Sequence, residues 1–190
     1  ISRDERLAAT VMENDAEIDR LEVELEEECL KVLALHQPVA VDLRFIVALL
    51  KMNNDLERIG DLAVNAAGRA RFLAGQEKLS LPYDLPAMAE EVRRMLKDCL
   101  DALVNLNLEI ANRVCRADDT VDDMNRQMYR QVMEAIRRDP DRLEAYINML
   151  SVSRYLERIA DHATNIAQDV IYLLEGEIVR HRGGQRGCGK

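Results

Sequence analysis

Apolar residues recur every three or four positions along most of the chain, a spacing that places them on one face of an α-helix. Interruptions at residues 36–38, 75–86, 118–119 and 139–140 predict helical segments over 1–35, 38–73, 86–113, 119–138 and 140–175. We expect Asp139 to cap the last segment and Pro140 to occupy its first position. The stripe expected to be buried in the first segment consists of Val11, Ile18, Leu21, Leu25, Val32 and Leu35.

The two halves of the chain carry the same motif. Residues 56–61 read Leu-Glu-Arg-Ile-Gly-Asp, and residues 156–161, which follow at an offset of 100, read Leu-Glu-Arg-Ile-Ala-Asp. Upstream, residues 14–19 align with residues 117–122 at an offset of 103. A period this long exceeds that of a solenoid repeat and indicates an internal duplication. We expect a first repeat over residues 1–78, a second repeat over residues 84–178, and a flexible basic tail over residues 179–190.

The duplication predicts an all-α fold made of two tandem three-helix antiparallel bundles. In the second half a long helix from about residue 86 precedes Asp118, whereas only fourteen residues precede the equivalent Asp15. We therefore expect the first helix of the first bundle to be truncated by roughly 17 residues, and the natural protein to start earlier.

Composition supports this fold class and excludes several others. Apolar residues make up 48% of the chain, aromatic residues only 4%, and tryptophan is absent, which is typical of aliphatic helix packing rather than a β-sheet protein. A net charge of −9 argues against a nucleic-acid partner. No apolar run approaches the roughly 20 residues of a membrane span. The cysteines form no Cys-x-x-Cys pair and are read as free thiols of a reducing cytosol, at positions Cys29, Cys99, Cys115 and Cys188.

Each half also carries two pairs of carboxylates spaced four residues apart, which places each pair on one helix face. On antiparallel neighbours both pairs lie to the same side of the apolar seam, so four carboxylates should meet at an open edge of each bundle. Their mutual repulsion would be relieved by a cation, and an all-oxygen set suits iron, manganese, magnesium or calcium, as well as zinc. The candidate ligands are Asp15, Asp19, Glu57 and Asp61 in the first half, and Asp118, Asp122, Glu157 and Asp161 in the second.

Other interpretations of these residues stay open. Acidic helix faces are often only solvated, and Arg58 and Arg158 lie beside the motifs, where they could neutralise the carboxylates. His162 is interpreted as a surface or capping residue rather than a ligand. The Glu-x-x-His motif of di-iron bundles is absent, as are phosphate-loop and nucleophile motifs. A binding or regulatory module is therefore favoured over an enzyme, with a metal-dependent hydrolase and a purely structural bundle as the alternatives.

Two stretches resemble the PhoU family of phosphate-transport regulators. Residues 37–44, Gln-Pro-Val-Ala-Val-Asp-Leu-Arg, followed by 55–61, Asp-Leu-Glu-Arg-Ile-Gly-Asp, are similar to the first half of that family. Residues 155–167, Tyr-Leu-Glu-Arg-Ile-Ala-Asp-His-Ala-Thr-Asn-Ile-Ala, continued by Val-Ile-Tyr at 170–172, are similar to its second half. The resemblance covers residues 1 to about 182 and departs at the start, where the family has a fuller first helix.

The resemblance implies multinuclear metal clusters, with iron or zinc as the expected metal, at the eight carboxylates named above. It implies a cytoplasmic homodimer, not an enzyme, that represses the phosphate-starvation response when phosphate is plentiful. The partners it implies are the ATPase of the phosphate ABC transporter and a membrane-bound sensor histidine kinase. No direct membrane insertion of this chain is expected.

Overall fold

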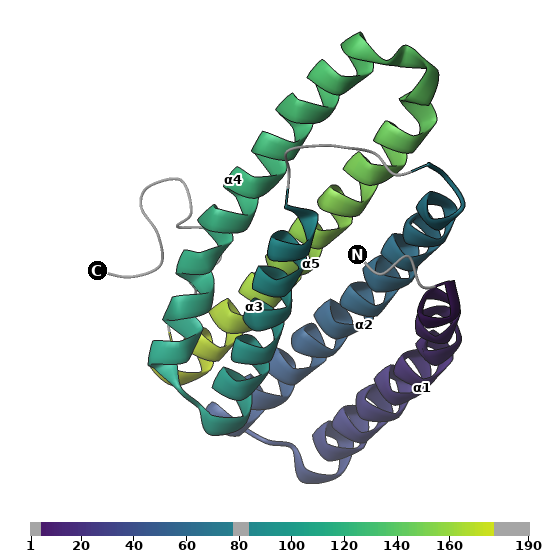
Figure 1. Cartoon of the computed structure of the whole chain (residues 1–190). Coiled ribbons are helices and arrows are strands. Elements are labelled where there is room, and N and C mark those ends of the chain that lie inside the picture. Colours follow the sequence, from purple (N-terminus) through teal and green to yellow (C-terminus); the bar gives the residue numbers. More distant parts are fainter. Residues whose placement is uncertain (1–4, 78–83, 177–190) are drawn as a thin grey trace.

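The computed structural model describes residues 5–77 and 84–176 of the 190-residue chain. These residues form long helices joined by short turns, and no β-strand occurs among them, so the all-α prediction is confirmed. Figure 1 shows the helices lying roughly alongside one another. The elements are α1 (Glu5–His36), α2 (Val41–Ala74), α3 (Leu85–Asn105), α4 (Leu108–Arg138), the 3₁₀ helix η1 (Pro140–Arg142) and α5 (Leu143–Glu175).

The turn between α1 and α2 lies where the proline was expected to divide the helices, but α2 begins three residues after Pro38, at Val41. Gln37 and Ala40 both have positive φ angles, of 45° and 52°. This backbone conformation is outside the right-handed helical region, and it delays the start of the helix. The first helical hydrogen bond of α2 then runs from the Arg44 N–H to the Ala40 carbonyl.

The break between the third and fourth helices differs from the prediction. It lies at Leu106 and Asn107 rather than at residues 118–119, and Asp118 is inside α4. Leu106 adopts a left-handed conformation, and the Asn107 side chain accepts hydrogen bonds from the N–H groups of Glu109 (3.0 Å) and Ile110 (3.1 Å). An asparagine N-cap therefore starts α4. Asp118 and Asp119 lie within this helix, where Asp118 is partly buried and Asp119 is exposed.

The entry to α5 also differs in detail. Pro140 does occupy a first helical position, but it starts η1, and α5 proper begins at Leu143. Asp139 makes no side-chain capping hydrogen bond. Its Oδ2 instead lies 3.3 Å from Nε of Arg142, so the carboxylate is used in an ion pair within the turn.

Helix α5 is the centre of the fold, because it packs against α2, α3 and α4, whereas α1 contacts only α2 among the described helices (Figure 1). The three-helix bundle expected in the second half is thus formed by α3, α4 and α5. Its core is closely filled, since Met95, Val121 and Ile166 have almost no exposed surface. In the first half, the described residues form a hairpin of two helices, α1 and α2.

The apolar stripe of α1 is less buried than the sequence predicts. Ile18 is 38% exposed and Leu21 51%, while Val121, which is equivalent to Ile18 in the repeat, is fully buried. The reason is that α3 covers α4 in the second half, and no described helix covers α1 in the same way. Burial of this stripe was therefore predicted wrongly at Ile18, Leu21, Leu25 and Leu35.

Two further expectations concern the thiols and the chain ends. Cys29 and Cys99 are free thiols, as expected, and the structure buries both of them as well as Cys115. Cys188 and the predicted tail over residues 179–190 lie outside the described residues, as do residues 78–83 of the segment between the halves. Among the described helices, none has both the length and the apolar character needed to cross a membrane.

Candidate metal centre

The second half brings three of its four predicted ligands into one cluster. Glu157 and Asp161 lie one turn apart on α5, and Asp122 faces them from the neighbouring helix α4. One carboxylate oxygen from each residue lies within 4.8 Å of the others. A divalent cation binds oxygen ligands at about 2.0–2.6 Å, so oxygens of one coordination shell are separated by no more than about 5 Å. The spacing of these oxygens fits such a cation.

Asp118 contributes to the same acidic environment. Its pKa is raised chiefly by burial, and then by the charges of Asp122, Asp119 and Glu157. Burial likewise raises the pKa of Asp161 to about 6, with further contributions from Glu157, Asp118 and Asp122. Neighbouring carboxylates therefore help to raise the pKa values of Asp118 and Asp161, which is the situation a bound cation relieves.

Glu157 carries a second feature of this cluster that bears on cation binding. Its Oε2 atom is buried and has no hydrogen-bond partner among the described residues. Burial raises the pKa of this carboxyl, the charge of Arg154 opposes that shift, and Asp122 reinforces it. A buried carboxylate oxygen without a partner is energetically costly. The donor set and this orphaned oxygen both fit a metal ion held by α4 and α5.

The first half gathers the equivalent carboxylates but balances them differently. Burial raises the pKa of Asp15, and the charges of Asp19 and Asp61 add to the shift. The pKa of Glu57 is raised by burial and by Asp61, while Arg58 lowers it. Asp15, Asp19, Glu57 and Asp61 thus face a common edge, yet within the described part of this half no three carboxylates come within 4.8 Å of one another.

Arg58 accounts for much of this difference between the halves. Its Nε lies 3.4 Å from Oε2 of Glu57, and its Nη1 lies 3.2 Å from Oδ2 of Asp61. The equivalent Arg158 forms no ion pair within 4.0 Å among residues 5–77 and 84–176. An arginine side chain therefore forms ion pairs within the first acidic edge, whereas at the second edge Arg154 and Arg158 act on Glu157 only from a greater distance.

The close approach of α1 to α2 at the first acidic edge depends on Gly60. A Cβ atom at this position would lie 3.3 Å from Cδ1 of Ile18 and 3.4 Å from Oδ1 of Asp15. The distance to Ile18 is tighter than most van der Waals contacts, so an alanine at this position would require the Ile18 side chain to shift by a few tenths of an ångström, while the distance to Asp15 is an ordinary contact. The repeat has alanine, Ala160, at the equivalent position of α5.

His162 has a role that the sequence analysis missed. Its Nδ1 lies 2.8 Å from Oδ1 of Asp55, and the two side chains are only 19% and 12% exposed. Asn165 donates a longer hydrogen bond of 3.4 Å to the same oxygen. His162 is thus neither a surface nor a capping residue, because it pairs across the α2–α5 contact. The repeat offered a signal, since the equivalent positions are Tyr155 and Leu62, and the polar pair breaks that symmetry.

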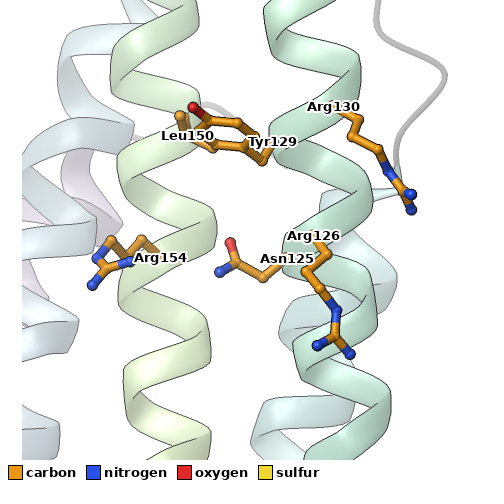
Figure 2. Close-up of a pocket in the computed structure, with 6 residues that line it drawn as sticks. All are labelled: Asn125, Arg126, Tyr129, Arg130, Leu150 and Arg154. Carbon is orange, nitrogen blue, oxygen red and sulfur yellow. The ribbon is translucent and has the colours of Figure 1, made fainter.

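A groove between α4 and α5 is a second feature that was not anticipated. It encloses a cavity of about 460 Å³. Figure 2 shows Tyr129 and Leu150 side by side in the groove, with arginines on both flanks. The lining residues are Asn125, Arg126, Tyr129, Arg130, Leu150 and Arg154.

Comparison with known protein families shows which family the chain is related to. Residues 1–70 and 85–170 match the PhoU domain, so one matched segment falls in each half. The chain belongs to the PhoU family. The resemblance seen in the sequence motifs is thereby confirmed.

Individual PhoU relatives cover most of the chain. A phosphate-specific transport system accessory protein PhoU homolog from Aquifex aeolicus is 41% identical over 176 residues, which is 93% of this chain and 80% of that protein. The corresponding homolog from Clostridium acetobutylicum is 35% identical over 93% of this chain and 81% of its own length.

Solved PhoU structures share the fold. The crystal structure of PhoU from Pseudomonas aeruginosa superposes with a TM-score of 0.88 at 36% identity, covering 92% of this chain and 84% of that one. The phosphate transport system regulatory protein PhoU from Streptococcus pneumoniae gives a TM-score of 0.82 at 28% identity, covering 94% and 84%.

Proposed function

We propose that this chain is a cytoplasmic, metal-binding adaptor that signals phosphate sufficiency. PhoU relatives are named as accessory or regulatory proteins of phosphate transport. The adaptor would connect the ATPase of the phosphate ABC transporter with a sensor histidine kinase and repress the starvation response. An accessory role, rather than catalysis, agrees with the names of the relatives. The observation that carries the metal-binding part of the proposal is the carboxylate cluster of Asp122, Glu157 and Asp161.

The residues of the second acidic edge would hold the metal. Asp118 and Asp122 reach it from α4, and Glu157 and Asp161 reach it from α5. Iron or zinc is the expected metal, and manganese, magnesium and calcium also accept oxygen ligands. When bound, the metal supplies positive charge that compensates these carboxylates. These side chains face one another between α4 and α5. The surface that the two helices form at this edge would therefore depend on whether the carboxylates are neutralised.

This arrangement links charge at the edge to partner binding. With the carboxylates ionised and uncompensated, the edge is strongly negative and repels an acidic surface. Neutralised carboxylates hold α4 against α5 and present a different potential to a partner. The first edge, with Arg58 across Glu57 and Asp61, is already partly compensated. We therefore assign the regulated surface to the second edge.

The metal-binding part is tested by elemental analysis of the protein purified without an affinity tag that carries metal. The variant Glu157→Gln/Asp161→Asn should lose most of the bound metal. A matched control, Glu134→Gln/Glu144→Gln, removes one carboxylate from each of the same two helices away from the cluster and should keep it. Equal metal content in the two variants would show that the cluster is not the site.

The adaptor part needs a separate measurement. Binding of the sensor kinase and of the transporter ATPase to the wild-type chain and to both variants can be followed by surface plasmon resonance. We expect the cluster variant to change kinase binding and the control to leave it unchanged. A phosphatase assay with added manganese tests the hydrolase alternative, and metal-dependent turnover abolished in the cluster variant would contradict the assignment as a non-enzymatic adaptor.

A further inference from the structure

The groove between α4 and α5 has the size of a small-molecule site. Its cavity of about 460 Å³ lies within the range of ligand pockets in proteins, roughly 300–1,000 Å³. It lies about one helical turn from the acidic cluster, since Asn125 follows Asp122 on α4 and Arg154 precedes Glu157 on α5, each by three residues. None of its lining residues is a predicted metal ligand, so the groove is distinct from the candidate metal centre.

One end of the groove presents an oriented hydrogen-bond donor. Ser153, which is fully buried, donates a 2.9 Å hydrogen bond from its Oγ to Oδ1 of Asn125. This bond holds the amide group, and its Nδ2 atom forms no hydrogen bond in the described part of the chain. Figure 2 shows the Asn125 side chain between the two helices, directed from α4 towards α5. An amide N–H group held in this way favours a ligand that brings an acceptor oxygen.

Arginines flank this donor on both helices. In Figure 2, Arg154 projects from α5 and Arg126 from α4, both near the level of Asn125. Arg154 forms no ion pair within 4.0 Å among the described residues. Arg126 pairs with Asp123, but the two side chains are 62% and 68% exposed, and an ion pair so exposed is weak. Guanidinium groups bind phosphate oxygens through paired N–H bonds, so this end of the groove suits a phosphate chain.

The other end of the groove is aromatic and apolar. Tyr129 and Leu150 lie side by side there, and Tyr129 is 54% exposed (Figure 2). Arg130 projects from α4 beside this end and pairs with no described carboxylate. An exposed tyrosine ring offers a face on which a planar ring can stack. A ligand that fills the whole groove therefore combines a planar ring with negatively charged oxygens.

The internal repeat shows that this chemistry is specific to the second half. The helical framework is shared, because Leu150 of the groove is matched by Leu50. The other side chains differ, and their first-half equivalents are Glu22 for Asn125, Glu26 for Tyr129, Glu27 for Arg130 and Asn54 for Arg154. Three acidic residues at these positions would repel an anion. The donors and the aromatic ring of the groove are therefore not a requirement of the helix pair itself.

We propose that the α4–α5 groove binds a nucleotide, a ligand in which a planar base carries a chain of phosphate groups. The base stacks on Tyr129 and contacts Leu150. The phosphate chain accepts hydrogen bonds from Asn125 and Arg154, and Arg126 reaches it from α4. Inorganic phosphate alone or a base alone occupies only one end of the groove. The site depends neither on metal binding nor on the adaptor role.

The acidic cluster one turn away opposes a polyanion in the groove. Burial raises the pKa of Glu157, and the charge of Arg154 opposes that shift, so this arginine lies within electrostatic range of the cluster. In the metal-free protein, Glu157→Gln/Asp161→Asn should therefore bind a nucleotide at least as tightly as the wild type, because it removes negative charge without touching the groove. Weaker binding by this variant would mean that the ligand is held by the carboxylates, and it would overturn the proposal.

Isothermal titration calorimetry on the full chain, in buffer with a chelator, tests the proposal with ATP, inorganic triphosphate and adenosine as probes. ATP should bind at one site per chain. Triphosphate should bind at least fivefold more weakly because it lacks the base, and adenosine more weakly still because it lacks charge. Arg154→Gln should weaken ATP and triphosphate binding at least tenfold. Tyr129→Leu should weaken ATP binding at least fivefold and leave triphosphate binding unchanged, since only the base stacks on the ring.

A matched control removes the same charge outside the groove. Arg116→Gln replaces an exposed arginine of α4 that does not line the cavity, and it should bind ATP as the wild type does. Arg154 and Tyr129 are also exposed, so all variants should keep the helical fold, which circular dichroism checks. No ATP binding, equal binding by Arg154→Gln and Arg116→Gln, or triphosphate that binds as tightly as ATP would each overturn the proposal. Metal is absent throughout, so these outcomes leave the proposed function to be decided by metal content.

Discussion

Asp55 on α2 and His162 on α5 form a 2.8 Å contact across the helix pair that joins the two halves of the molecule. Both side chains are largely shielded from water. Asp55 lies two residues before Glu57, and His162 directly follows Asp161. The contact therefore fixes the position of one acidic edge relative to the other, and it has no counterpart in the symmetry of the repeat.

Removing either member of this pair should destabilise the protein. We expect His162→Ala to lower the free energy of unfolding by about 1–3 kcal/mol, because it leaves the largely buried Asp55 without that partner. The double variant Asp55→Ala/His162→Ala should cost less than the sum of the two single variants. Urea denaturation of all three proteins measures this coupling, and strictly additive effects would show that the contact contributes nothing.

The two halves should respond differently to the same loss of apolar volume. Met128 is fully buried in a cluster with Ala145 and Tyr146 of α5, whereas the equivalent Leu25 is 37% exposed on α1. Met128→Ala should lower the free energy of unfolding by about 2–5 kcal/mol. Leu25→Ala should lower it by less than about 1 kcal/mol, since less area leaves water. Equal losses in denaturant unfolding would mean that α1 is covered in solution.

The raised pKa of Asp161, about 6, makes the stability of the metal-free protein depend on pH. The folded state holds this proton at pH values where the unfolded chain, with an ordinary aspartate pKa near 4, has released it. Folding stability should therefore fall as pH rises from about 4 to 6. In the presence of a chelator, Asp161→Asn should raise the melting temperature at pH 7.5, and the gain should shrink towards pH 4.5. A gain that grows with acidification would contradict this assignment.

Arg58 should limit metal binding at the first acidic edge. The variant Arg58→Ala removes the cation that pairs with Glu57 and Asp61. We expect it to bind additional zinc or manganese in isothermal titration calorimetry, because these carboxylates then require another counter-charge. The matched variant Arg158→Ala serves as the control and should add no site, since Arg158 pairs with no described carboxylate. If Arg58→Ala binds no more metal than the wild type, Arg58 is not the competing cation.

Much of the fold follows from local patterns, and the exceptions have physical causes. The proline at 38 and the glycine at 176 locate the α1–α2 turn and the end of α5, because those residues act within one turn. The break at Leu106 was missed because it depends on one left-handed residue followed by an asparagine cap. The exposure of Ile18 was missed because burial is set by the neighbouring helix, which local periodicity does not specify.

The candidate site was likewise predicted in part from local sequence patterns. The duplicated spacing of Glu157 and Asp161 was enough to place both on one helix face opposite Asp122. The spacing did not distinguish the two acidic edges, because the Arg58 rotamer and the packing around each cluster decide which edge keeps its charge. The Asp55–His162 contact joins two residues that are 107 positions apart in sequence, and only the broken symmetry of the repeat indicated it.

Anomalous X-ray diffraction from crystals grown with zinc, recorded on both sides of the zinc absorption edge, tests the metal centre most directly. We predict an anomalous peak between α4 and α5, at about 2.0–2.2 Å from carboxylate oxygens of Asp122, Glu157 and Asp161. The peak should be absent in Glu157→Gln/Asp161→Asn. Diffraction that shows zinc elsewhere, with no peak beside these three carboxylates, would contradict the account.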